Sequence, residues 1–153
     1  MRTTTPLEAL PELAVRYCAH LGLNVKARFE PSGDETLFPN RLLLEGPDAS
    51  MLLAQRGQAL DALQFLLHEA QGERDESKLV YLDVQGYRLF RMKELQAMAN
   101  LAADKARSIG RFALGGLNPR ERRWVHLTIA HHPDLTTESE GTGAIKTLVV
   151  KRA

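Results

Sequence analysis

Hydrophobic residues repeat at helical spacing in the first part of the chain. Leucines and small apolar residues recur every three or four positions over 7–21, which predicts an amphipathic helix that Gly22 can end. Thr5 and Glu8 have the spacing of a capping box in front of this helix. Pro11 lies inside the pattern, and because proline has no N–H to donate, it must kink the helix or delay its start.

Alternating and continuous apolar runs then predict strands around a pair of helices. Residues 25–29 alternate apolar and charged side chains, as a half-buried strand does, and 41–45 is predicted to be the return strand. A short helix over 49–54 and a longer one over 58–70 are expected next, followed by an apolar strand over 79–84. The element order through this part of the chain is therefore αββααβ.

The second half is predicted to contain one long helix and a small sheet. Residues 87–109 are rich in Ala, Leu and Met and contain no proline, so they are expected to form a single helix. Strands are predicted at 111–114, near Thr136 and at 145–151, with a turn at Gly115–Gly116. A further short helix falls between these strands. The expected fold class is α+β.

Charge is distributed unevenly along the 153 residues. Residues 1–87 carry 8 Lys/Arg against 13 Asp/Glu, whereas 88–153 carry 12 against 6, so a polyanion is expected to bind mainly to the second half. The single cysteine, Cys18, excludes an internal disulfide and fits a reducing compartment. The chain has no signal-peptide pattern and no stretch approaching the ~20 apolar residues of a membrane span. We expect a cytoplasmic protein.

The helix expected after Asn118 carries the most specific cluster of chemical groups. Asn118 is a good N-cap, Pro119 suits the first helical position and Glu121 can complete a capping box. Arg122 and His126 are four residues apart, so they lie on one face of the helix, one turn apart. A permanently charged guanidinium beside an imidazole suits a phosphate or a base edge.

The sequence around this cluster resembles a known nucleic-acid-binding module. The run NPRERRWVH, followed by HHPDLTTESEG, is similar to the R-three-H domain in the form found in the Jag/KhpB family of bacterial proteins. The resemblance implies that Arg122 and His126 bind the backbone and exposed bases of a single strand. Arg120, Arg123 and Lys146 are expected to assist them.

A second segment resembles the KH domain of the same family. The run LLAQRGQALDALQFL and the αββααβ order are similar to the type II KH fold, whose GxxG turn holds four nucleotides. Glycines let such a turn approach phosphate closely. Here the turn is Ala54-Gln55-Arg56-Gly57, so a methyl group replaces the first glycine and can repel the phosphate or restrict the turn. Arg56 still offers a phosphate contact, and both a working clamp and a purely structural turn remain open.

These features together predict a type II KH-like domain over 4–86, a connecting helix over 87–110 and a small α+β R-three-H domain over 111–153. The expected function is binding of single-stranded RNA, with single-stranded DNA as a second ligand. The alternative is a protein-interaction or dimerisation scaffold whose KH turn no longer binds RNA, with a small separate KH protein or a second copy as its partner. Replacing Arg122 and His126 is expected to weaken strand binding with little loss of thermal stability, because exposed polar changes cost little.

Catalytic and metal-binding interpretations have less support. Adjacent histidines point apart and no cysteine or HExxH motif accompanies them, which argues against a metal site in the cluster His126, His131, His132 and Asp134. Ser139 lacks the GxSxG elbow of a serine hydrolase. We therefore expect no metal, no cofactor and no enzymatic activity. Trp124 is a candidate base-stacking residue, although a core position is the favoured interpretation.

Overall fold

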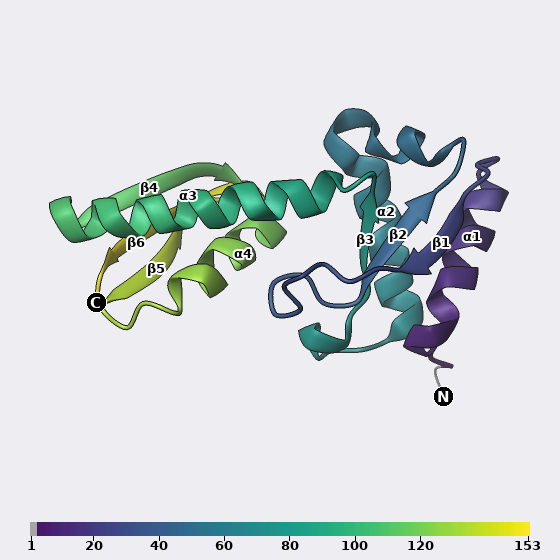
Figure 1. Ribbon diagram of the computed structural model, residues 1–153, viewed down its shortest axis with the longest axis horizontal. Coiled ribbons are helices and arrows are strands. Elements are labelled where there is room, and N and C mark those ends of the chain that lie inside the picture. Colours follow the sequence, from purple (N-terminus) through teal and green to yellow (C-terminus); the bar gives the residue numbers. More distant parts are fainter. Residues whose placement is uncertain (1–2) are drawn as a thin grey trace. The chain divides into compact units, whose positions relative to one another are not determined.

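The computed structural model describes residues 3–153, and the chain divides into two compact units, Met1–Leu89 and Phe90–Ala153. In the first unit, two helices cover one face of a three-stranded sheet (Figure 1): α1 (Leu10–His20), α2 (Ala54–Gln71), β1 (Lys26–Phe29), β2 (Arg41–Glu45) and β3 (Tyr81–Val84). Three 3-10 helices complete it: η1 (Leu7–Ala9), η2 (Ala49–Leu53) and η3 (Glu76–Lys78). Strand β1 is antiparallel to β2, and β2 is parallel to β3 because η2 and α2 form a crossover between them.

The αββααβ order expected for this unit is confirmed, with η2 as the first of the two central helices. The predicted N-terminal capping box is wrong, because no side chain caps η1 and the N–H of Thr5 donates instead to the carbonyl of Ala70 at 2.8 Å. The first α-helix begins only at Leu10, so that Pro11 falls in its first turn, where a missing N–H costs nothing.

The apolar core of the first unit lies between the helices and the sheet. It draws on alternate positions of the strands, which is why Leu42 and Leu44 of β2 are buried beside Leu82 and Val84 of β3. The remaining buried members are Leu10, Ala14, Cys18, Val25, Ala49, Leu52, Leu60, Leu63, Leu67 and Val80. Burial raises the pKa of the Cys18 thiol, so this side chain is a packing group.

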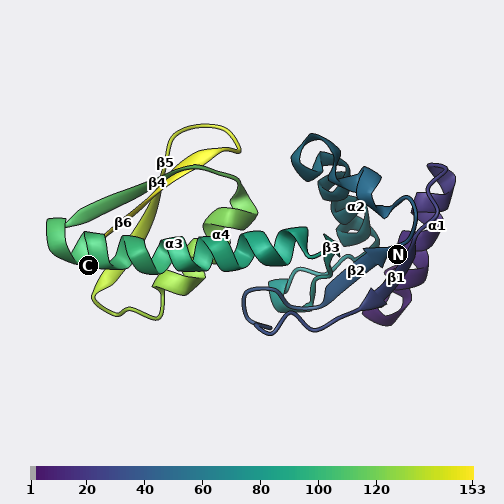
Figure 2. The ribbon, with the colours of Figure 1, turned by 45° about the horizontal axis from the view of Figure 1, so that its top comes forward.

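The second unit is a three-stranded antiparallel sheet with two helices. Its strands have the order β4-β6-β5, and α3 runs along the sheet with α4 beside it (Figures 1 and 2). The elements are α3 (Tyr87–Ile109), β4 (Arg111–Leu117), α4 (Pro119–Ile129), β5 (Leu135–Glu140) and β6 (Lys146–Arg152). Helix α3 begins in the first unit and belongs to the second from Phe90 onward, where one face is buried: Met92, Leu95, Ala99, Ala102, Ala103 and Ala106.

Strand β4 is longer than the sequence predicts. The expected turn at Gly115–Gly116 is wrong, because both glycines lie within the strand, at an irregularity in its pairing with β6 between Leu114 and Leu117. Gly116 has a φ of +71°, which a residue with a Cβ rarely adopts, so the glycine permits the local change of register. The irregularity places Leu117 beside Lys146, directly before the start of α4.

Candidate nucleic-acid interface

The start of α4 has the capping box that the sequence predicts. The side chain of Asn118 accepts from the N–H of Glu121 at 2.9 Å, and the Glu121 carboxylate accepts from the N–H of Asn118 at 3.3 Å. The other oxygen of Glu121 accepts from Nε of Arg91 in α3 at 2.7 Å. Glu121 is buried whereas Arg91 is partly exposed, and their ion pair helps to fix the first turn of α4.

Arg122 supports the local structure as well as carrying charge. It is half-buried, and its Nη1 donates to the carbonyl oxygens of Leu117 and Ala144 at 2.7 Å each. The guanidinium therefore ties the end of β4 to the loop that joins β5 and β6. The sequence suggests that Arg122 is an exposed side chain whose loss costs little stability, and these two bonds revise that expectation.

His126 lies one turn further along α4 and is exposed. Its Nδ1 is 2.6 Å from the hydroxyl oxygen of Thr137 in β5, so the imidazole is held against the sheet. The strand pairing puts Thr137 on the same face of the sheet as Leu148 and Lys146, since residues two apart in a strand share a face. Arg122 thus reaches the β5–β6 loop through Ala144, His126 contacts β5 further from that loop, and Lys146 begins β6 on the same face of the sheet as Thr137.

The other two arginines of α4, Arg120 and Arg123, are less exposed than His126. The guanidinium of Arg120 lies 5.6 Å from the ring centre of Trp124, within cation–π range. Trp124 is only 3% exposed, which confirms the core interpretation and removes it as a stacking platform. Arg120 and Arg123 are both half-buried, so Lys146 and His126 are at least as accessible to a ligand.

The carboxylates next to Thr137 point away from this face. Side chains alternate along β5, so Glu138 and Glu140 lie on the opposite side of the sheet from Thr137. There they pair with Lys151 at 2.6 Å and with Arg111 at 2.9 Å. The hydrogen bond from Lys151 lowers the pKa of Glu138. This alternation keeps two negative charges off the Arg122–His126 side.

The second candidate site is the turn between η2 and α2. Ala54 has an extended backbone, with φ −55° and ψ 147°, whereas Gln55, Arg56 and Gly57 have left-handed φ values of 54°, 59° and 79°. Ala54 therefore needs no glycine for its conformation, and only the space taken by its methyl group remains as an obstacle to a phosphate. Ala54, Gln55 and Arg56 are exposed, and Gly57 is buried.

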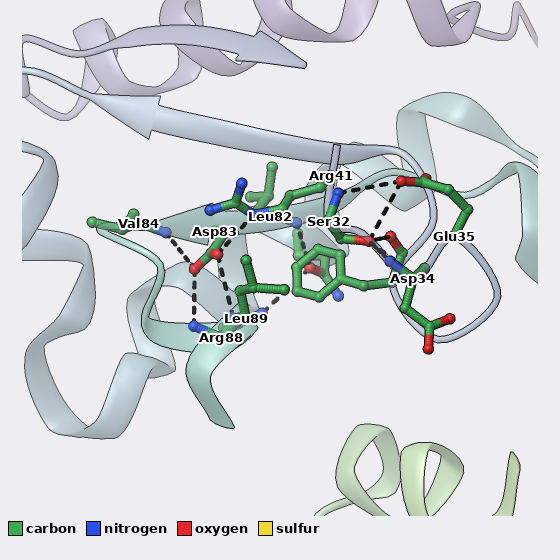
Figure 3. Close-up of polar contacts among 11 residues, drawn as sticks. Ser32, Asp34, Glu35, Arg41, Leu82, Asp83, Val84, Arg88 and Leu89 are labelled. Carbon is green, nitrogen blue, oxygen red and sulfur yellow. Dashed lines mark hydrogen bonds and ion pairs between the residues drawn. The ribbon is translucent and has the colours of Figure 1, made fainter. Parts of the chain in front are cut away.

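Arg88, at the start of α3, supports this turn from beneath. It is 2% exposed, and its guanidinium donates to the carbonyl of Gly57 at 3.3 Å, to Gln64 at 3.3 Å and to the carboxylate of Asp61. Asp83 holds the backbone of Arg88 in turn, accepting from its N–H at 2.9 Å (Figure 3). The turn thus rests on buried charged groups that hydrophobic periodicity cannot reveal.

Asp83 is the centre of a fully buried polar network. Its carboxylate accepts from Nε of Arg41 at 2.9 Å and from the N–H groups of Val84 and Leu89 at 2.8 and 3.3 Å (Figure 3). The N–H groups of Arg88 and Leu89 belong to the first turn of α3, which has no helical carbonyls to accept them, so Asp83 caps this helix from the sheet. An ion pair with Arg41 balances the buried charge.

Of the two histidines that follow α4, His132 lies in an ion-pair cluster. Arg107 donates to both oxygens of Asp134, at 2.7 and 3.0 Å, and lies 2.9 Å from Nδ1 of His132. The hydrogen bond from Arg107 lowers the pKa of Asp134 to about 2. Within residues 3–153, no group of three or more His, Cys, Asp or Glu side chains is arranged to hold a metal ion. None of the helices over these residues is long and apolar enough to cross a membrane.

Comparison with known proteins supports the resemblance seen in the sequence. Residues 93–152 match the family model of the R-three-H domain named above. The chain is also similar to the RNA-binding protein KhpB of Clostridium symbiosum, with 26% identity over 147 residues. The match covers 94% of this chain and 66% of that protein, so the chain spans just under two thirds of the relative's length. Both matches agree with the resemblance of the sequence to the Jag/KhpB family.

Proposed function

We propose that this chain binds single-stranded nucleic acid, primarily RNA, without catalysing a reaction on it, and that the main contact is the Arg122–His126 face of α4. The observation that carries the proposal is the arrangement around α4: an arginine and an exposed histidine one turn apart, with Lys146 on the same face of the sheet as Thr137 and the neighbouring carboxylates on the far face. The R-three-H match over 93–152 and the name of the relative support the ligand class. A cytoplasmic location fits this ligand.

Each partner atom has a distinct role in the proposed contact. Arg122 keeps a permanent charge while Nη1 is bonded to two carbonyls, so it attracts phosphate from a fixed position. His126 presents an imidazole nitrogen that can reach a phosphate oxygen or a base edge. Lys146, Arg120 and Arg123 add positive charge around the strand without fixing its sequence.

A second contact is proposed at the turn Ala54–Gly57 of a KH domain over 4–86, with 87–110 as the connecting helix and 111–153 as the R-three-H domain. The exposed residues Gln55 and Arg56 lie at the start of the regular part of α2, where N–H groups and the helix dipole favour an anion. Arg56 would hold a phosphate there. Two weak contacts on one strand gain avidity only when their spacing matches its path.

The competing function is a protein scaffold with a KH unit that does not bind RNA. Its specific support is the methyl group of Ala54 at the position where a clamp uses glycine, together with the acidic balance of residues 1–87. A small KH protein or a second copy of the chain would then be the partner. Ala54→Gly separates the two functions, because it enlarges the space over the turn and would maintain or raise RNA affinity only if the turn is a clamp.

The proposal is tested by fluorescence anisotropy with short labelled single-stranded RNA, single-stranded DNA and duplex controls. His126→Ala is the informative variant, because His126 is exposed and makes one side-chain contact, and His131→Ala is its matched control on an exposed histidine outside the site. We expect saturable single-strand binding that His126→Ala weakens and His131→Ala does not. No binding by the intact protein would reject the function and favour the scaffold.

A further inference from the structure

The contact between His126 and Thr137 fixes one end of the imidazole ring. Nδ1 lies 2.6 Å from the Thr137 hydroxyl oxygen, a short hydrogen bond whose direction depends on the tautomer of the ring. The two residues come from different elements, α4 and β5, so the bond restricts rotation of a side chain that is otherwise exposed. The other ring nitrogen, Nε2, is then the one that a ligand reaches.

The chemistry of the ligand determines which nitrogen must carry the proton. Phosphate oxygens only accept hydrogen bonds, so an imidazole nitrogen that faces them has to be an N–H donor. A neutral imidazole has one N–H, and its other nitrogen is an acceptor. If Nε2 is the donor, Nδ1 must receive a hydrogen bond, and a threonine hydroxyl has the hydrogen to give.

The charged groups around His126 bear on which ring nitrogen carries the proton. Arg122 and Arg123 precede His126 on α4 by four and three residues, and Lys146 lies on the same face of the sheet as Thr137; all three are cationic. Glu138 and Glu140 lie on the opposite face, paired with Lys151 and Arg111. The partner of Nδ1 is therefore the uncharged hydroxyl of Thr137 and not a carboxylate, and this hydroxyl orients the ring of His126.

We propose that Thr137 is a positioning residue for the nucleic-acid site: its hydroxyl donates to Nδ1 of His126, holds the ring in the tautomer with the proton on Nε2, and turns that N–H toward the strand. The inference rests on the proposed function, and it assigns a role to a side chain that does not itself touch the ligand. The proposed role also explains why the residue of β5 that lies opposite Val150 is a threonine and not an apolar residue.

The tautomer is measured directly by nitrogen NMR of the histidine ring in the full-length protein at pH 8, where ordinary histidines are neutral. We expect the wild-type His126 spectrum to show a protonated Nε2 and an unprotonated Nδ1. Thr137→Val keeps the β-branched shape that suits a strand but removes the hydroxyl, so we expect mixed tautomers. A wild-type spectrum with the proton on Nδ1 would overturn the proposal without any variant.

Binding gives a second, independent readout with the same labelled RNA. Thr137→Val should weaken binding by about 2- to 10-fold, the equivalent of one ordinary hydrogen bond. Thr137→Ser should restore both affinity and tautomer. The matched control is Thr136→Val, on the exposed neighbouring position of the same strand, which should change neither. Equal affinity and equal ring spectra for the two valine variants would refute the role of Thr137. Absence of binding by the wild type would reject the proposed function instead, while the ring spectra would still decide the tautomer.

Discussion

Replacing Arg122 by alanine should destabilise the second unit as well as remove a charge. The side chain is half-buried and its Nη1 donates to the carbonyls of Leu117 and Ala144, both at 2.7 Å. Alanine leaves those two oxygens without the donor and frees the β5–β6 loop from the end of β4. A loss of nucleic-acid binding in this variant therefore mixes two effects, and the structural effect has to be measured first.

The magnitude follows from the two hydrogen bonds. A bond from a charged donor contributes about 1.5–3 kcal/mol. Ala144 lies in an exposed loop where water can replace the guanidinium, so we count one bond in full and expect a loss of about 2 kcal/mol. For a small domain, each kcal/mol lowers the melting temperature by about 4–8 °C, so the shift should be roughly 10 °C. Arg122→Lys keeps the charge without the planar fork and should lie between wild type and alanine.

The chain offers a specific optical probe for this measurement. Trp124 is its single tryptophan and is 3% exposed in the second unit, so tryptophan fluorescence reports the unfolding of that unit alone. His126→Ala is the comparison, because it removes the hydrogen bond to Thr137 and should cost about 0.5–1.5 kcal/mol. An Arg122→Ala protein as stable as wild type would show that the two carbonyl bonds do not stabilise the fold, and the argument for a structural role would fail.

Four further outcomes are expected. Asp83→Asn should lower the stability of the first unit by about 2–4 kcal/mol in denaturant titration, since Arg41 loses its buried counter-charge; a smaller cost than that of a Glu69→Gln control on the exposed side of α2 would contradict the network. Gln55→Gly should stabilise the turn by about 1 kcal/mol, because Gln55 has a φ of 54°; Gln58→Gly, an exposed helical position, should destabilise instead. Burial lowers the pKa of His68, so the folded state resists protonation of this side chain. The stability of the first unit should therefore fall as pH drops below about 6.5, where the unfolded chain takes up the proton. Hydrogen exchange of the α2 amides should show this loss of stability, and His68→Gln should make it smaller. RNA affinity should fall with salt with a log–log slope of about −0.7 per phosphate contact, and a flat response would argue against the basic face as the contact surface.

Both candidate sites depend on arginines from the first two turns of α3. Arg88 bonds to the carbonyl of Gly57 beneath the turn of the first unit, and Arg91 bonds to Glu121 in the capping box of the second. Neither arginine is part of a motif quoted for nucleic-acid binding. Their bonds show why a helix expected from the sequence to act as a connector also carries side chains that hold the local structure of each unit.

The element order and the local geometry of α4 were predictable from the sequence. Hydrophobic periodicity of 2 or 3.6 residues is a property of the sequence alone. The capping box is local as well, because Asn118 and Glu121 bond to each other and are three residues apart. For the same reason Arg122 and His126 were correctly predicted to lie one turn apart on one helix. The buried position of Trp124 was favoured from its place between Arg123 and Val125 on a short helix.

The contacts of those side chains depend on the tertiary structure. Leu117 and Ala144 accept from Arg122, and Thr137 holds His126, because strand pairing brings residues far apart in sequence to one end of a sheet. The extended conformation of Ala54 could not be read from its identity, since alanine tolerates several backbone conformations. Asp83 likewise looks like an ordinary strand residue until α3 and Arg41 surround it. Local spacing places functional groups on a helix, and long-range packing determines which of their atoms remain available to a ligand.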